Sequence, residues 1–106
     1  MKLRDRFRKA YTWVPACEKL LDIGGDRGDV TEKYLEKAKE VHMLEINAAA
    51  VKYCKKHFPK VKAKQGQAEK LPYRNNMFDV VVMTETLEHV QDEQKTISEI
   101  HRVLKK

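Results

Sequence analysis

Two acidic residues and a glycine-rich turn are the part of this chain best suited to bind a ligand. The turn at residues 24–28 follows an apolar run that contains Asp22, and it leads into an amphipathic segment. A strand, tight turn and helix start of this kind direct backbone N–H groups and a helix dipole at a ligand. Glu45 ends the next apolar run, where an acid is placed to accept hydrogen bonds from ribose hydroxyls. Together these features predict a site for an adenosine-bearing cofactor.

The rest of the chain reads as alternating strands and helices, which would hold this turn in place. Such alternation predicts an α/β fold with a parallel sheet and right-handed crossovers. The strand at 61–65 alternates as an edge strand does, and the strand at 78–83 is continuously apolar from Val80, as buried parallel strands are. Strands are expected at 19–23, 41–44, 61–65 and 78–83, and helices at 2–12, 29–39, 48–58 and after Asp92.

Three short polar side chains are expected to begin helices. Asp29 with Glu32 three residues later is a capping box, while Asn47 and Asp92 precede the other two amphipathic segments. Pro59 is expected to end the second of these helices. The faces expected to be buried are, in chain order, Val30, Tyr34 and Ala38; Ala50, Val51, Cys54 and Phe58; and Ile97, Ile100 and Leu104.

Six segments resemble, in order, those of class I S-adenosylmethionine-dependent methyltransferases. Residues 22–28 are similar to the family's D-x-G-x-G-x-G turn, and residues 41–47 to its second strand with the ribose-binding acid. The resemblance implies a Rossmann-like sheet of strand order 3-2-1-4, with helices on both faces. Its ligand site would lie at the switch point between strands one and four. The remaining matches are residues 66–73, 78–82, 87–90 and 99–105.

The resemblance also implies which residues contact S-adenosyl-L-methionine. Glu45 would bind the ribose, Asp22 would lie near the methionyl end, and the Ala68 backbone N–H would face the adenine ring. Gly24 and Gly28 are equally compatible with plain turn glycines, and Leu71 and Tyr73 are better explained as core. The full set of expected cofactor contacts is Asp22, Gly24, Gly25, Asp26, Gly28, Glu45, Ile46, Gln67, Ala68 and Thr84.

Two positions depart from the family pattern in ways that predict weakened cofactor binding. Asp26 stands where the family has its middle glycine, which brings a side chain and a negative charge toward the methionyl carboxylate. Gln67 stands where the family usually has an aspartate that accepts a hydrogen bond from the adenine amino group. The Gln67 amide oxygen also accepts such a bond, but without charge, so that the bond is weaker.

The catalytic chemistry has one weak candidate, His89. By resemblance the chain transfers a methyl group to a small-molecule or RNA nucleophile, and no convincing general base is visible. Glu85, Glu88 and His89 would share one helical face that suits a divalent metal. Family members without a metal also carry L-E-H here, and this favours a site without metal. The alternative function is a non-catalytic methyltransferase-like module for binding or assembly.

Length and composition indicate one domain, residues 1–106. A chain of this length buries roughly 65% of its unfolded surface. The absence of an apolar leader or a membrane-length run favours a cytoplasmic protein, and the widely spaced Cys17 and Cys54 favour two reduced thiols. The net charge is +6, and six lysines with no acid lie between residues 51 and 64. These lysines suit either a nucleic-acid surface or a solvated helix face. The lack of interleaved aromatic residues favours the solvated face.

The resemblance ends before the last three strands of the family. The strand at 78–83, internal in the family, is therefore expected to be an edge in this chain. An apolar edge strand is an unpaired template that tends to acquire a partner. We therefore expect a homo-oligomer, most simply a two-fold dimer through this edge.

Overall fold

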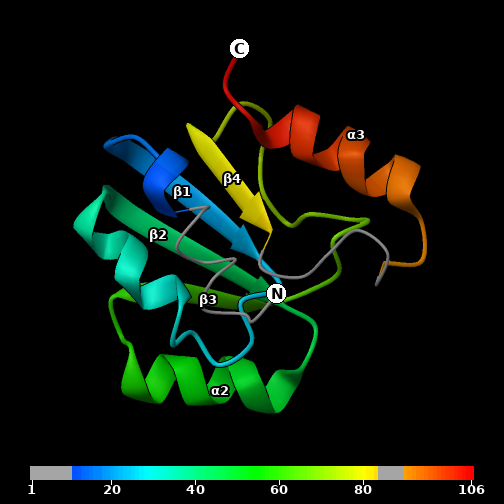
Figure 1. The fold of residues 1–106 in the computed structure, drawn as a ribbon. Coiled ribbons are helices and arrows are strands. Elements are labelled where there is room, and N and C mark those ends of the chain that lie inside the picture. The colour runs from blue at the N-terminus through cyan, green and yellow to red at the C-terminus, as the bar shows by residue number, and fades with distance from the viewer. Residues whose placement is uncertain (1–10, 84–89) are drawn as a thin grey trace.

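Four parallel strands form the centre of the protein, in the order β3-β2-β1-β4 (Figure 1). This computed structural model describes residues 11–83 and 90–106. The observed order confirms the predicted Rossmann-like arrangement. The elements are β1 (Cys17–Ile23), the 3-10 helix η1 (Thr31–Glu36), β2 (Ala38–Glu45), α2 (Ala48–His57), β3 (Val61–Gln65), β4 (Val80–Met83) and α3 (Glu93–Val103).

The strand register brings the carboxyl ends of all four strands to one end of the sheet. Ile23 of β1 is paired with Leu44 of β2 on one side and with Met83 of β4 on the other. Glu45 is paired with Gln65, the last residue of β3. The turns that follow β1, β2 and β3 therefore meet at this end, where open parallel sheets bind ligands.

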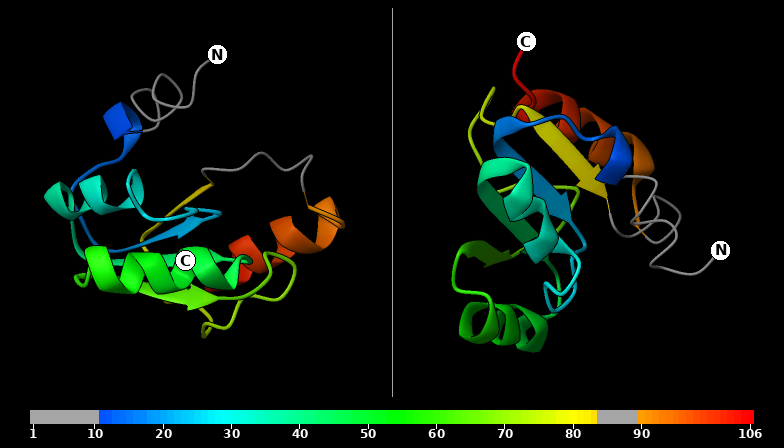
Figure 2. Two further views of the ribbon diagram at one scale, coloured as in Figure 1. Left: turned by 90° about the horizontal axis from the view of Figure 1, so that it is seen from below. Right: turned by 60° about the vertical axis from the view of Figure 1, so that its left-hand side comes forward.

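Helices cover both faces of the sheet, because alternate residues of β1 and β2 point to opposite sides (Figure 2). Leu20, Val41 and Met43 belong to a buried cluster beneath η1 and α2, which also contains Tyr34 and Cys54. A second cluster lies under α3, and it contains Leu21, Ile23, Leu44, Phe78 and Val103. The turn after β1 is thus fixed from both sides of the sheet.

The expected helix at 29–39 is shorter than predicted, and its capping box is absent. The helix is the 3-10 segment Thr31–Glu36, and the residue in the N-cap position, Val30, makes no side-chain cap bond. The Gly28 carbonyl accepts the Glu32 N–H at 2.9 Å, so the first turn is completed by backbone. Ala38 pairs with Cys17 in the sheet. The prediction was wrong at the end of this helix, because Ala38 and Lys39, which helical periodicity had assigned to the helix, belong to strand β2.

The other two caps are confirmed. Asn47 Oδ1 accepts the Ala50 N–H, and Asp92 Oδ1 accepts the Lys95 N–H, each at 3.0 Å. Helix α2 ends at His57, just before Phe58 and Pro59. It buries Ala50, Val51 and Cys54 as expected, while Phe58 is half-buried.

The buried face of α3 differs from the prediction at two positions: Leu104 follows the end of the helix and is half-buried, while Val103 is buried. Ile97, expected inside, is 52% exposed, while Thr96 is fully buried. The Thr96 hydroxyl donates to the Asp92 carbonyl at 2.9 Å, which satisfies the group inside the helix. Ile100 and Val103 complete this face. Thr96, whose hydroxyl is hydrogen-bonded, therefore occupies the buried position that the hydrophobic pattern had assigned to Ile97.

Strand β4 is short and only half-buried. It begins at Val80, two residues later than predicted, because Phe78 instead forms an isolated bridge with Leu104. All four of its side chains have intermediate exposure, and β4 ends the described sheet, so its predicted edge position is confirmed for the described residues. Of the expected helix at 2–12, only the end lies within the described residues, where Tyr11–Trp13 are helical. Among the described residues, no helix is long and apolar enough to span a membrane.

Candidate functional site

A hollow at the carboxyl ends of the strands brings together five of the predicted cofactor residues. Gly24, Glu45, Ile46, Gln67 and Ala68 all line it. They come from the turn after β1, the end of β2 and the segment after β3. The complete lining is residues 23–24, 44–46 and 66–69, Met83, and residues 90–91.

Glu45 is held rigidly at the mouth of β2. Its Oε1 accepts the Asp26 N–H at 2.9 Å, and its Oε2 accepts the Asn47 N–H at 2.8 Å. The side chain is buried, and within the described residues the structure records no ion pair for it. Each carboxylate oxygen accepts two hydrogen bonds, so both retain capacity for a ligand hydroxyl. This geometry fits the ribose-binding role that the sequence suggested.

The glycine-rich turn uses its residues in different ways. Gly24 and Gly28 have positive φ angles of 78° and 93°, which favour glycine. At Gly25 a Cβ would lie 2.4 Å from Thr31 Oγ1 and 2.5 Å from Met43 Cγ, so no side chain fits. Asp26 is exposed and has φ 55°, a left-handed conformation that costs a non-glycine residue roughly 1 kcal/mol.

Asp26 and Asp22 lie outside the hollow that Glu45 lines. Asp26 contributes to a separate depression that also includes Arg27, Asn47 and Tyr53. Asp22 is fully buried on the η1 side of the sheet, where its Oδ2 accepts the Thr31 hydroxyl at 2.7 Å. Asp22 therefore ties η1 to β1 from behind the turn. Burial, and secondly the nearby Asp22, raise the pKa of Tyr34 to about 12, so that the Tyr34 hydroxyl stays protonated.

The segment after β3 forms a tight turn over the hollow. The Gly66 N–H donates to the Glu45 carbonyl at 3.1 Å, and the Lys70 N–H donates to the Gln67 carbonyl at 3.2 Å. Ala68 is buried inside this turn, whereas the Gln67 side chain is exposed. The turn thus places the two residues expected at the adenine in the lining of the same hollow as Glu45.

Ile46 is an exposed apolar side chain at the edge of the hollow. It is 61% exposed, which is unusual for isoleucine. The Gln65 side-chain amide donates to the Ile46 carbonyl at 3.2 Å and fixes its backbone. An apolar group beside a hollow of this kind provides a surface for a flat ring.

The predicted catalytic and metal candidates, and the predicted cofactor contact Thr84, lie outside the described residues. Thr84, Glu85, Glu88 and His89 all belong to the segment 84–89. In the part of the chain that the structure describes, no three His, Cys, Asp or Glu residues are grouped so as to hold a metal ion. Cys17 and Cys54 are free thiols.

Sequence reasoning missed several residues of the hollow. Glu69 Oε2 accepts the Gln91 N–H at 3.1 Å, which links the turn after β3 to the start of the α3 segment. Met83 and Val90 supply apolar surface at the side of β4. Glu69 and Val90 fall inside the matched motifs, so their positions carried a signal, but their contacts depend on the fold.

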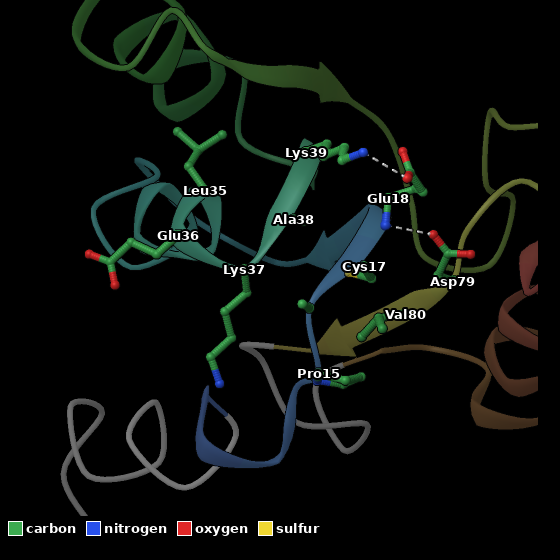
Figure 3. A pocket seen from close by; sticks show the side chains of 11 residues that line it. Pro15, Cys17, Glu18, Leu35, Glu36, Lys37, Ala38, Lys39, Asp79 and Val80 are labelled. Atoms are coloured by element: carbon green, nitrogen blue, oxygen red, sulfur yellow. Dashed lines mark hydrogen bonds and ion pairs between the residues drawn. The ribbon is translucent and has the colours of Figure 1, made fainter.

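A second hollow lies at the amino-terminal end of the sheet, and its charged side chains are bonded to other groups of the chain (Figure 3). Lys39 Nζ lies 3.1 Å from Glu18 Oε1. Asp79 Oδ2 accepts the N–H groups of Glu18 and Lys19, at 3.0 and 2.8 Å. Burial, and secondly Asp79, raise the pKa of the Cys17 thiol, which keeps it protonated and weakly nucleophilic. The polar groups of this hollow therefore connect parts of the fold and are more consistent with a structural role than with catalysis.

The lysines between residues 51 and 64 divide between two surfaces. Those at 52, 55, 56 and 60 are exposed on α2 and the following turn. Lys62 bonds Glu40 Oε1 at 2.7 Å, and Lys64 lies 5.2 Å from the centre of the Tyr73 ring, both on the α3 side of the sheet. On α2, Tyr53 stacks on His57 at 4.1 Å beside the exposed lysines, so aromatic groups do adjoin them. A nucleic-acid surface there stays a prediction.

A sequence model of the methyltransferase-domain family matches residues 21–106. This covers most of the chain, including both walls of the carboxyl-end hollow. The chain belongs to this methyltransferase-domain family. Membership implies S-adenosyl-L-methionine as the cofactor, and the glycine turn, the buried Glu45 and the apolar edge at Ile46 fit that ligand.

Curated relatives of this methyltransferase domain agree with the family assignment. The chain is 30% identical to a ubiquinone/menaquinone biosynthesis C-methyltransferase of Psychromonas ingrahamii, over 98% of this chain and 45% of that protein. It is 33% identical to the protein of the same name from Idiomarina loihiensis, with the same coverage. The chain thus spans about half the length of the curated relatives it matches.

Solved structures show the same fold. The YcgJ protein of Bacillus subtilis superposes with a TM-score of 0.83 at 25% identity, over 98% of this chain and 46% of that one. A Thermotoga maritima protein, described as an S-adenosylmethionine-dependent methyltransferase and possible histamine N-methyltransferase, gives 0.81 at 23% identity, over 98% and 47%. These likenesses cover the whole of the sheet described above.

Proposed function

We propose that this methyltransferase domain binds S-adenosyl-L-methionine in the carboxyl-end hollow and positions its methyl group for transfer to a small-molecule nucleophile. The observation that carries the proposal is the geometry of Glu45. Its carboxylate is oriented by two backbone N–H groups and faces the hollow with acceptor capacity remaining. The relatives named as quinone-biosynthesis C-methyltransferases favour a small organic acceptor over RNA.

Each wall of the hollow would hold one part of the cofactor. Glu45 would accept the ribose hydroxyls, Ile46 would pack on the adenine, and the Gln67–Ala68 turn would face the edge of the adenine. Gly24, with its positive φ, allows the backbone to approach the ligand closely. The sulfonium of the bound cofactor supplies an already activated methyl group. The protein's contribution is then mainly to position the donor and acceptor.

Titration calorimetry with S-adenosylhomocysteine and S-adenosylmethionine tests the proposal. The family's middle glycine is replaced by Asp26 and its usual aspartate by Gln67, so we expect affinity in the micromolar to millimolar range with a stoichiometry of one. Saturable binding of both ligands supports the function. Absence of binding at millimolar ligand would contradict it and favour the non-catalytic module.

A further inference from the structure

Arg102 and Glu99 of α3 lie outside the hollow, but they bind the segment next to the turn at residues 67–70. This turn would face the edge of the adenine and forms the adenine wall of the hollow. All five N–H donors of the Arg102 guanidinium are used. Its Nε and one Nη2 N–H bond the Glu99 carboxylate at 2.6 and 3.1 Å. The remaining three bond the carbonyls of Leu71 and Tyr73 and the Asn75 side chain, at 2.8–2.9 Å.

Leu71 is held at both of its backbone groups. Its N–H donates to Glu99 Oε1 at 2.8 Å, and its carbonyl accepts from Arg102 Nη2 at 2.9 Å. Its side chain is buried in the cluster under α3. Leu71 directly follows the Gln67–Lys70 turn, whose other end is fixed by the Gly66 N–H on the Glu45 carbonyl. The adenine wall is thus hydrogen-bonded to β2 at one end and to the Glu99–Arg102 pair at the other.

We infer that Glu99 and Arg102 are positioning residues, which set the hydrogen-bonding edge of the turn and thereby the preference for adenine over other purines. The inference rests on the proposed function. The Gln67 amide oxygen and the Ala68 N–H read the adenine only if the turn holds one conformation. Without Glu99 and Arg102 the turn would keep the Glu69–Gln91 bond and its internal Lys70–Gln67 bond but lose both bonds at Leu71. It would then offer the same groups over a wider range of orientations, and a hydrogen bond weakens steeply as its angle departs from linear.

A lysine at position 102 cannot reproduce this fastening. Lysine has three donors on a single nitrogen, whereas the guanidinium spreads five donors over a planar fork. Glu99 is equally constrained, because it accepts from Arg102 and from the Leu71 N–H together. The pKa of Glu99 is lowered, first by Arg102.

The test compares S-adenosylhomocysteine with S-inosylhomocysteine, in which a 6-oxo group and a protonated N1 replace the adenine edge. Wild type is expected to prefer the adenine ligand. In Arg102→Ala this preference should fall by about tenfold, the effect of losing one oriented hydrogen bond, with Arg102→Lys and Glu99→Gln intermediate. Lys39→Ala is the matched control, since it removes the Lys39–Glu18 ion pair at the far end of the sheet. That variant should keep the wild-type preference.

The ratio of the two affinities separates positioning from simple stability. A purely structural role would lower the melting temperature and weaken both ligands alike, leaving the ratio unchanged. An unchanged ratio in folded Arg102→Lys and Glu99→Gln would therefore overturn the inference, even where Arg102→Ala fails to fold.

Amide hydrogen exchange tests the fastening without ligand. The N–H groups of Lys70, Leu71 and Gln91 bond the Gln67 carbonyl, Glu99 Oε1 and Glu69 Oε2, respectively. Exchange at these amides should quicken in Glu99→Gln and Arg102→Lys relative to Lys39→Ala. If wild type binds neither nucleoside ligand, the proposed function fails, and this exchange result still decides whether the pair holds the turn. Unchanged exchange at these three amides would overturn the fastening itself.

Discussion

The two ends of the sheet use the same local device for different purposes. At the carboxyl end, Glu45 accepts the N–H groups of Asp26 and Asn47. At the amino end, Asp79 accepts that of Glu18 (Figure 3) and that of Lys19. In both places one carboxylate gathers two backbone donors that strand pairing leaves unsatisfied.

The difference lies in what neutralises each carboxylate. Asp79 has a cation, because Lys105 Nζ lies 3.2 Å from its Oδ1. The pKa of Asp79 is lowered, first by the Lys19 N–H and also by Lys105. Glu45 faces a hollow, and the structure records no ion pair for it among the described residues. A carboxylate matched by its own chain is structural, while one left facing open space is available to a ligand.

The largest expected difference in cofactor affinity is between single substitutions of the two acids, Glu45 and Asp79. Glu45→Ala should weaken S-adenosylhomocysteine binding by about 1–3 kcal/mol, the range for hydrogen bonds to a charged acceptor. Asp79→Asn should lower the melting temperature yet leave the affinity within about twofold, since Asp79 does not line the hollow. Calorimetry on both variants measures the contrast. Equal losses of affinity would show that the two ends are not functionally distinct.

The two edges of the sheet extend the comparison to assembly. Edge strand β3 carries Lys62 and Lys64, whereas β4 consists of Val80, Val81, Val82 and Met83, all half-buried. Charged side chains discourage pairing between edges, and an uncharged apolar edge invites it. We expect this 106-residue chain to form a dimer through β4 at micromolar concentration, and Val82→Lys to give a monomer. Analytical ultracentrifugation decides, and a wild-type monomer would sink this proposal.

A smaller effect is expected at the turn between Gly24 and Gly28. Asp26 has φ 55°, so Asp26→Gly should stabilise the protein by up to about 1 kcal/mol. Removing the charge should also tighten cofactor binding by a few-fold. Chemical denaturation and calorimetry measure the two effects separately. Weaker binding in Asp26→Gly would mean that the Asp26 side chain contacts the ligand.

The smallest expected effect is a loss of stability at acidic pH. Because the folded-state pKa of Asp79 is lowered, its contribution to stability is present above the ordinary aspartate range and is lost as pH falls through the folded pKa. The contribution should be below about 1 kcal/mol, since Asp79 and Lys105 are partly exposed. The difference in the free energy of unfolding between wild type and Asp79→Asn should therefore be slightly smaller at pH 3 than at pH 7. Chemical denaturation of both proteins at the two pH values measures it. An unchanged difference between the two proteins would rule this linkage out.

Sequence reasoning placed the predicted cofactor residues at one end of the sheet because their signals are local. Glu45 ends β2, Asn47 caps the helix that follows it, and the turn glycines follow β1, so each role is suggested by near neighbours in the chain. The errors arose where tertiary contacts decide. Pairing of Ala38 with Cys17 shortened η1, and a satisfied Thr96 hydroxyl displaced Ile97 from the core.

The role of the Glu99–Arg102 pair could not have been predicted from the sequence. Both residues fall inside a matched motif, but their partners, from Leu71 to Asn75, lie 27 to 31 positions away in the chain. Only the packing of α3 on the sheet brings these groups together. Asp22 is a similar case, since its bond to Thr31 depends on where η1 lies.

Amide chemical shifts recorded during titration with S-adenosylhomocysteine test the central claim most directly, because they compare both ends of the sheet in one experiment. We predict saturable shifts at Gly24, Ile46 and Ala68, with Glu18 and Lys39 unmoved. Shifts centred on Glu18 and Lys39, or none at all at millimolar ligand, would contradict the assignment of the carboxyl-end hollow as the cofactor site.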